Sequence, residues 1–267
     1  MLPPSIIESS EQLIKAYKCS VSLIPNNEII DMEGISIVGS NTDSIMLNPI
    51  FISNKIRDEA DLEARLKTIV GHIKKSKFPW MVIVCEDFLP EAIKSRTSEI
   101  FARYELGFLL KLAGMAADKL VPYEKQIPEL ECRLIENEEM AIAAGEINAI
   151  AYDFPLDSFS PLFAIEEYWQ KRLFGYLGYV EDKPVCVGTT LENDGQLYVV
   201  WIATLPEYRN KGYAKKVVWR SLQTAREKTG LSSSVLHATE GGAFVYKKLG
   251  FSPVSSFQCF YSNKSGN

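Results

Sequence analysis

One short pattern occurs twice in this chain, and the repeat is the feature that most limits how the chain can fold. The stretch "FARYELGF" at residues 101–108 is echoed by "FVYKKLGF" at residues 244–251. Each octet is typical of the last turns of a helix, because the glycine adopts the left-handed conformation that ends a helix without steric cost. Helix capping alone explains a single octet, so the flanking segments decide whether the chain repeats a fold.

The second half of the chain, from residue 131 onward, has a regular order of elements. Apolar spacing predicts a strand, two helices and an antiparallel meander of three strands, with the last strand at residues 196–204. The next helix carries one apolar stripe and ends near Gly230. A strand, a helix that ends in the second octet, and a final strand follow. The predicted order of this half is βααβββαβαβ.

The first half repeats the later part of that order more roughly. Helix, strand, helix, Leu-Gly-Phe and strand recur in both halves, so we predict an α/β (α+β) fold of tandem domains. Each domain is expected to be a mixed, mostly antiparallel sheet flanked by helices, with the C-terminal copy complete. Prolines interrupt regular structure near residue 128, which places the predicted domains at residues 1–128 and 129–267. The helices predicted here include residues 6–17, 59–76 and 91–106, and a second-half helix is predicted at 161–172.

Composition excludes several classes of protein. The 267 residues carry a net charge of −5 and a pI near 5.3, which argues against a nucleic-acid binder, whose phosphate contacts need a basic face. Five scattered cysteines and two histidines suggest neither a metal site nor a disulfide framework. No apolar run is long enough to cross a membrane, and the first ten residues do not resemble a leader peptide. We therefore expect a reduced cytoplasmic protein without metal, nucleic acid or membrane partners.

The stretch "IATLPEYRNKGYAKKVVWR" carries the clearest chemistry. A strand runs into a proline turn, and a helix then opens with unpaired backbone N–H groups and partial positive charge. Gly212 and the small Ala214 let an anion approach these amides, so a diphosphate fits the loop. A solvated, lysine-rich helix face is the alternative interpretation of the charges. The basic residues of this stretch are Arg209, Lys211, Lys215, Lys216 and Arg220.

At this point the sequence resembles a known family. The pattern R-x-x-G-x-A, present as "RNKGYA", is similar to the acyl-CoA pyrophosphate loop of the GNAT superfamily of N-acyltransferases. The later "ATEGGAFVYKKLGF" is similar to the second cofactor motif of that family, in which a tyrosine stands five residues before the phenylalanine. Here that tyrosine is Tyr246. The resemblance extends over about residues 131–267.

The resemblance implies that acetyl-CoA binds between two splayed strands, which end near Thr204 and Thr239. Main-chain groups would pair with the pantetheine arm, and amides of the loop would hold the diphosphate. Tyr246 would act as the acid that serves the departing thiolate, although it could also simply pack its helix. The implied cofactor-binding residues are Ile202, Ala203, Thr204, Arg209, Asn210, Lys211, Gly212, Tyr213, Ala214 and Thr239.

The implied reaction is direct attack of a primary amine on the thioester within a ternary complex. The acceptor is a small molecule or a protein, and a homodimer is possible. The general base stays open between His237, a water relay and carboxylates near the rim. A non-catalytic acyl-CoA sensor or protein-interaction module is the alternative function, and another phosphorylated ligand is a third possibility. The candidate carboxylates are Glu166, Glu167, Glu192, Asp194 and Glu240.

The first copy lacks these features. Its equivalent helix follows a turn without glycine and begins with Asp58, Glu59 and Asp61, which suit the helix dipole but repel a diphosphate. Arg103 occupies the position of the tyrosine. We therefore expect that the first copy does not bind the cofactor in this way. Two roles remain for it, as a wall of the acceptor cleft or as a cover for apolar surface.

Overall fold

The computed structural model describes residues 2–123 and 125–262, with the side chains of residues 170 and 171 left aside. Its contacts divide the chain into two compact units. The first unit holds the described chain up to Gly114, together with Ala238–Glu240 and the residues from Pro253 onward. The second unit holds Met115–His237 and Gly241–Ser252. Each unit is described by itself below.

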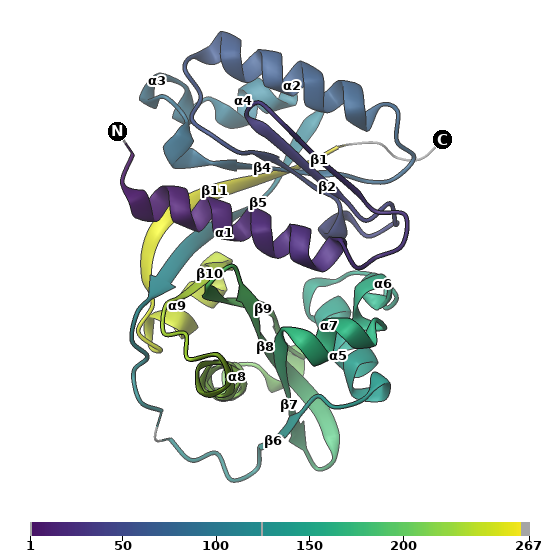
Figure 1. Cartoon of the computed structure of the whole chain (residues 1–267), viewed down its shortest axis with the longest axis vertical. Helices are drawn as coiled ribbons and strands as arrows, with labels where there is room; N and C mark the ends of the chain where they lie inside the picture. Colours follow the sequence, from purple (N-terminus) through teal and green to yellow (C-terminus); the bar gives the residue numbers. More distant parts are fainter. Residues whose placement is uncertain (1, 124, 263–267) are drawn as a thin grey trace. The chain divides into compact units, whose positions relative to one another are not determined.

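The first unit is a six-stranded sheet with helices on both faces. The strand order is β1-β2-β3-β4-β11-β5, and β3 and β4 are parallel, whereas β11 is antiparallel to β4. Figure 1 shows α1 on one face of this sheet and α2 on the other. The elements are α1 (Pro4–Val21), β1 (Glu28–Met32), β2 (Ile35–Gly39), β3 (Pro49–Ile52), α2 (Glu59–Ile73), β4 (Met81–Cys85), α3 (Glu91–Lys94), α4 (Thr97–Ala102), β5 (Leu106–Ala117) and β11 (Ser252–Ser262).

The core of the first unit lies between α2, α4 and the sheet. Leu62, Leu66 and Ile69 follow helical spacing and are fully buried against the strands. Phe101 of α4 stacks on Phe260 of β11, with ring centroids 3.9 Å apart. The last strand of the chain therefore completes the core of the first unit.

Polar contacts also hold β11 in the first unit. The Glu86 carboxylate, directly after β4, accepts hydrogen bonds from Lys111 Nζ at 2.9 Å, Gln258 Nε2 at 2.5 Å and the Ser256 hydroxyl. Burial raises the pKa of Glu86, but these donors outweigh it and leave the pKa below its usual value. Strand β11 thus belongs to the first unit although it lies at the far end of the sequence, and β5 runs on from the first unit into the second beyond Gly114. The boundary between sequence copies at residue 128 stays a prediction.

The second unit is a sheet in the order β5-β10-β9-β8-β7-β6. Strands β6 to β9 are antiparallel, and β10 is parallel to β9. Helix α8 packs on β7–β9 from one side and α5 packs on β8 and β9 from the other (Figure 1). The elements are β6 (Glu131–Leu134), α5 (Glu138–Tyr152), α6 (Ser160–Phe163), α7 (Glu166–Lys171), β7 (Leu173–Val180), β8 (Lys183–Asn193), β9 (Gln196–Thr204), α8 (Tyr213–Thr229), β10 (Ser234–Ala238) and α9 (Glu240–Lys247).

The predicted fold class, tandem domains with mixed and mostly antiparallel sheets, is confirmed, but two predicted helices are broken. The helix expected at 91–106 is interrupted because the Thr97 hydroxyl donates to the carbonyl oxygen of Ile93, at 3.1 Å. The helix expected at 161–172 is interrupted where Ile165 is extended, and the Trp169 indole donates to the carbonyl of Phe163 at 2.8 Å. Strand β1 was not predicted, because its residues do not alternate between apolar and polar.

Candidate functional site

A bulge in β9 shapes the centre of the second unit. Two residues of β9, Trp201 and Ile202, face the single residue Gly188 of β8 where the register shifts, and Trp201 has a positive φ of 55°. A Cβ on Gly188 would lie 2.9 Å from the backbone nitrogen of Val218 in α8. The glycine therefore lets α8 pack directly on the bulge, and the bulge redirects the end of β9.

Beyond the bulge, β9 leaves its parallel neighbour. The pairing with β10 joins residues 197–199 to residues 234–236, whereas β9 continues to Thr204. The Thr204 Oγ1 atom is buried without a hydrogen-bond partner in the described structure. The carbonyl of Ile202 accepts a hydrogen bond from the Tyr152 hydroxyl at 2.7 Å and retains a second lone pair. The β9 end is therefore separated from β10, and the opening between two splayed strands that the family resemblance implied as the cofactor site stays a prediction.

The N-terminus of α8 is left without a side-chain cap. Gly212 occupies the N-cap position with a φ of 90°, and in the described part of the chain this helix start has no side-chain cap. By contrast, Asp58 caps α2 through the Asp61 amide, and Asn137 caps α5 in the same way. The first amides of α8 therefore remain available to an anion.

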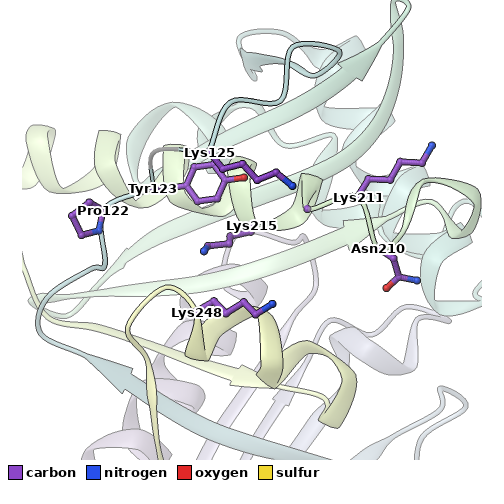
Figure 2. Close-up of a pocket in the computed structure, with 8 residues that line it drawn as sticks. Pro122, Tyr123, Lys125, Asn210, Lys211, Lys215 and Lys248 are labelled. Atoms are coloured by element: carbon purple, nitrogen blue, oxygen red, sulfur yellow. The ribbon is translucent and has the colours of Figure 1, made fainter.

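A pocket of about 320 Å³ lies over this uncapped turn. Figure 2 shows lysine side chains from separate segments around it. Burial lowers the pKa of Lys215, and the like charges of Lys248 and Lys125 lower it further. A phosphate in this pocket would relieve that repulsion. The lining residues are Pro122, Tyr123, Lys125, Asn210, Lys211, Gly212, Lys215 and Lys248.

Two loop residues predicted to bind the cofactor use their side chains elsewhere. The Arg209 guanidinium donates to the carbonyls of Ala151 at 2.7 Å and Thr204 at 3.2 Å, which ties the end of α5 to the end of β9. The Tyr213 side chain is 3% exposed and donates to Glu129 at 3.3 Å. A cofactor role for either residue would therefore rest on its backbone amide, and these roles stay predictions.

Tyr246 lies in α9 with 8% of its surface exposed. Burial raises the pKa of this phenol well above its usual value, and the nearby Tyr152 raises it further. Its ring meets the Phe251 ring edge-on, with centroids 6.1 Å apart. The phenol therefore stays protonated, which makes it a hydrogen-bond donor rather than a ready source of a proton.

His237, the candidate base that lies in a strand, is a poor proton acceptor. Its Nδ1 atom is 2.8 Å from the Tyr198 hydroxyl, and the two rings are stacked with centroids 5.7 Å apart. Burial lowers the pKa of His237 to about 3. This value favours a packed, neutral histidine over a general base. Thr239 falls in Ala238–Glu240, which contacts assign to the first unit, so its predicted cofactor role stays a prediction.

In the first copy, side chains of the copy itself occupy the start of α2, the helix equivalent to α8. The Asp58 carboxylate accepts the Asp61 amide at 2.8 Å, so this helix start already carries an anion. Arg103, at the position of the tyrosine, pairs with Glu59 at 2.6 Å and Glu63 at 3.1 Å. These contacts agree with the expectation that this copy does not bind the cofactor.

Four residues near the site were missed by the sequence reasoning. Tyr123 and Lys125 belong to the segment around Pro122 and Pro128 that links the two sequence copies, which we call the join. Lys248 belongs to the second octet, residues 244–251, and Tyr152 is the last residue of α5. A basic residue inside "KKLGF" was a usable signal for Lys248. No local pattern distinguished the other three, because only the packing brings them to the loop.

Residues 144–251 match the model of the Acetyltransferase (GNAT) family. This segment is a GNAT acetyltransferase domain. It contains β9, the loop, α8 and the helix that carries Tyr246, and therefore includes both motifs found in the sequence. The chain matches none of the curated proteins with which it was compared.

Solved structures extend the likeness to the first copy. A GCN5-related N-acetyltransferase from Kribbella flavida has a TM-score of 0.72 and 16% identity over 97% of this chain and 96% of its own. A similar protein from Sphaerobacter thermophilus has a TM-score of 0.59 and 11% identity over 85% and 76%. A tandem GNAT protein from the clavulanic acid biosynthesis pathway has a TM-score of 0.56 and 8% identity over 97% and 96%. The fold is therefore that of a tandem GNAT protein.

Two further features bear on the classes considered above. No helix within residues 2–123 and 125–262 is long and apolar enough to span a bilayer. In those same ranges, no group of three or more His, Cys, Asp and Glu side chains is arranged to hold a metal ion.

Proposed function

We propose that this protein transfers an acetyl group from acetyl-CoA to a primary amine of a small molecule or a protein. The match of residues 144–251 to the acetyltransferase (GNAT) family supports acyl transfer in general, and the cofactor, acceptor and reaction are the proposed part. The observation that supports acetyl-CoA most directly is the uncapped start of α8 beneath a pocket with four lysines. A helix start of this kind holds a diphosphate through its amides and its dipole.

The residues of the second unit fit a CoA thioester along its length. Lysines and α8 amides would neutralise the phosphates. The end of β9 would pair with the amide groups of the pantetheine arm. Thr204 offers a buried hydroxyl without a partner in the described structure, and the Ile202 carbonyl oxygen has a second lone pair that can accept a hydrogen bond. The bulge at Trp201 would aim that arm away from β10.

The proposed chemistry is a direct transfer. Acetyl-CoA supplies the thioester, the amine nitrogen forms a bond to its carbonyl carbon, and the carbon–sulfur bond breaks. A backbone N–H near Thr204 would stabilise the carbonyl oxygen as negative charge develops. The Tyr246 hydroxyl would donate a hydrogen bond to the leaving thiolate. The ammonium gives one proton to water before attack, and the nitrogen gives up a second proton as the amide forms, which balances the negative charge of the released thiolate. Water takes this role in place of His237, whose low pKa makes it an inefficient base.

A thiol-release assay with acetyl-CoA and a panel of amines tests this function. We expect at least one primary amine to accelerate the release of CoA above hydrolysis, with an acetylated product of matching amount. Calorimetry with CoA, ATP and NADPH identifies the phosphorylated ligand in parallel. Tight CoA binding without acceleration by any amine would contradict the proposed enzyme activity and support the alternative function, a non-catalytic acyl-CoA sensor.

A further inference from the structure

The join between the two sequence copies is docked on the repeated octet. The backbone N–H of Val121 donates to the carbonyl of Leu249 at 3.0 Å. The next residue, Gly250, has a φ of 103°, and a Cβ there would lie 2.8 Å from the carbonyl oxygen of Lys119. The glycine therefore serves two purposes, since it ends α9 and gives the join room to pass close by.

This docking places Tyr123 beside the start of α8. The residue is 8% exposed, and its hydroxyl is buried without a hydrogen-bond partner in the described structure. Its ring packs near Trp219 at 6.2 Å between centroids. The ammonium groups of Lys215 and Lys216 lie 5.0 and 5.3 Å from the ring centroid. A buried hydroxyl without a partner is costly, so its persistence points to a ligand that completes it.

The surroundings of Tyr123 select an anion as that ligand. Three separate segments supply the lysines of the pocket: Lys125 from the join, Lys211 and Lys215 around the start of α8, and Lys248 after α9. No carboxylate is found among the described residues that line it. Figure 2 shows the hydroxyl end of the Tyr123 ring turned toward the side of the pocket where Lys125 lies. A neutral phenol among ammonium groups can donate to a phosphate oxygen.

We propose that the join is part of the ligand site, and that the Tyr123 hydroxyl donates a hydrogen bond to a phosphate oxygen of bound CoA. This proposal rests on the proposed function, and it concerns residues outside the segment that matches the family, 144–251. The diphosphate and the ribose phosphate of CoA carry the same chemistry, so either can be the acceptor. On binding, the ammonium groups of Lys215 and Lys216, which lie over the Tyr123 ring, would turn toward the phosphate and hold the phosphate next to the Tyr123 hydroxyl.

The test uses Tyr123→Phe, with Tyr179→Phe as the matched control, because Tyr179 lies on β7 beneath Arg133. Calorimetry on the full chain measures the affinity for CoA and for dephospho-CoA at constant ionic strength. Tyr123→Phe is expected to weaken CoA binding about tenfold, as for a lost hydrogen bond to a charged group. An equal loss with dephospho-CoA assigns the contact to the diphosphate, and a loss with CoA alone assigns it to the ribose phosphate.

Thermal unfolding without ligand separates this role from a structural one. Removing a buried hydroxyl that has no partner is expected to leave the melting temperature of Tyr123→Phe unchanged or higher. Weaker binding together with a lower melting temperature would overturn the proposal, as would CoA affinity within twofold of the wild type. If the wild-type protein does not bind CoA, the proposed function fails as well, so the two failures are distinguishable.

A second pair of variants tests the charge contributed by the join. Lys125→Gln is expected to reduce CoA affinity about threefold to tenfold, and the reduction should diminish at high salt. Lys228→Gln makes the same change of charge at the other end of α8 and should leave affinity unchanged. Equal effects of the two variants would show that the join supplies no local contact, which contradicts the proposal.

Discussion

At the scale of single residues, the raised pKa of Tyr246 changes the role that the family resemblance implied. Reference pKa values of a phenol and a thiol differ by only about two units, which made proton donation plausible. Burial in α9 widens that difference by raising the pKa of the phenol. Tyr246 is therefore better suited to stabilise a thiolate by a hydrogen bond than to protonate it outright.

Replacing Tyr246 with phenylalanine should separate chemistry from binding. We expect kcat to fall about 100-fold, in the range seen when one donor to a developing charge is removed. CoA affinity should stay within about twofold, since the hydroxyl serves only the departing sulfur. Steady-state kinetics and calorimetry measure the two quantities. Tyr176→Phe is the control, because that hydroxyl pairs with Thr224 at 3.0 Å. An unchanged kcat would show that Tyr246 merely packs its helix.

His237 should make the protein sensitive to acid. Its pKa is about 3 when folded, against a usual value of 6.5, so between these values only the unfolded state takes up the proton. This contribution to stability is present above pH 6.5 and is lost progressively toward pH 3. At pH 4 the loss amounts to about 3 kcal/mol. His237→Gln should therefore lose less unfolding free energy between pH 7 and pH 4 than the wild type, as measured by urea denaturation. Parallel losses would contradict the assignment.

At the scale of elements, the bulge of β9 depends on a glycine in the neighbouring strand. Gly188 is the residue that allows the backbone of α8 to approach, and the approach positions the start of α8 beside the end of β9. Sequence patterns predicted the strand and the helix correctly. They did not show the bulge, because the extra residue in β9 follows from its pairing with β8 rather than from local preference.

Gly188→Ala should destabilise the protein and disturb the site together. The new Cβ would lie 2.9 Å from a backbone atom that cannot rotate away, so we expect a loss of about 1 to 3 kcal/mol. Gly71→Ala is the control, because a Cβ there meets nothing within 4 Å. That helical position should gain about 0.5 to 1 kcal/mol. Denaturant titration of both variants gives the comparison. Equal stabilities would mean that α8 has room to shift.

At the scale of the whole molecule, the order of the chain and the order in space differ. The last strand, β11, follows the GNAT domain in sequence but completes the sheet and core of the first unit. Neither sequence copy, taken as one continuous stretch of chain, therefore contains all the residues of a compact unit. Stability of the first unit is expected to depend on residues that lie at the far end of the chain.

Phe260→Ala tests this dependence. Phe260 is fully buried and stacks on Phe101, so the loss should be about 3 to 5 kcal/mol and should appear first in the first unit. Trp80 is fully buried in the same core and reports on it. Fluorescence of a variant that retains Trp80 as its single tryptophan follows that unit during denaturation. If the unit that contains Trp80 unfolds as in the wild type, β11 does not stabilise it.

Local chemistry explains which features the sequence predicted. The N-terminus of α8, the glycine turn before it and the tyrosine of α9 all depend on residues within a few positions of one another. Lys125 and Tyr152 could not be predicted in the same way, since each joins the site from a distant segment. The sequence showed Arg209 only as a member of a basic cluster, and it did not show that packing directs the guanidinium to two backbone carbonyls.

The sequence by itself determined the fold class, most of the elements, and the glycine turn that opens α8, because turns, caps and apolar periodicity act over short stretches of chain. Only the tertiary structure decided that β11 belongs to the first unit, that a bulge bends β9, and that the join docks beside α8. These features depend on pairing between distant segments. Such pairing is selected by the burial and hydrogen bonding of the folded unit, and no short stretch of sequence carries that information.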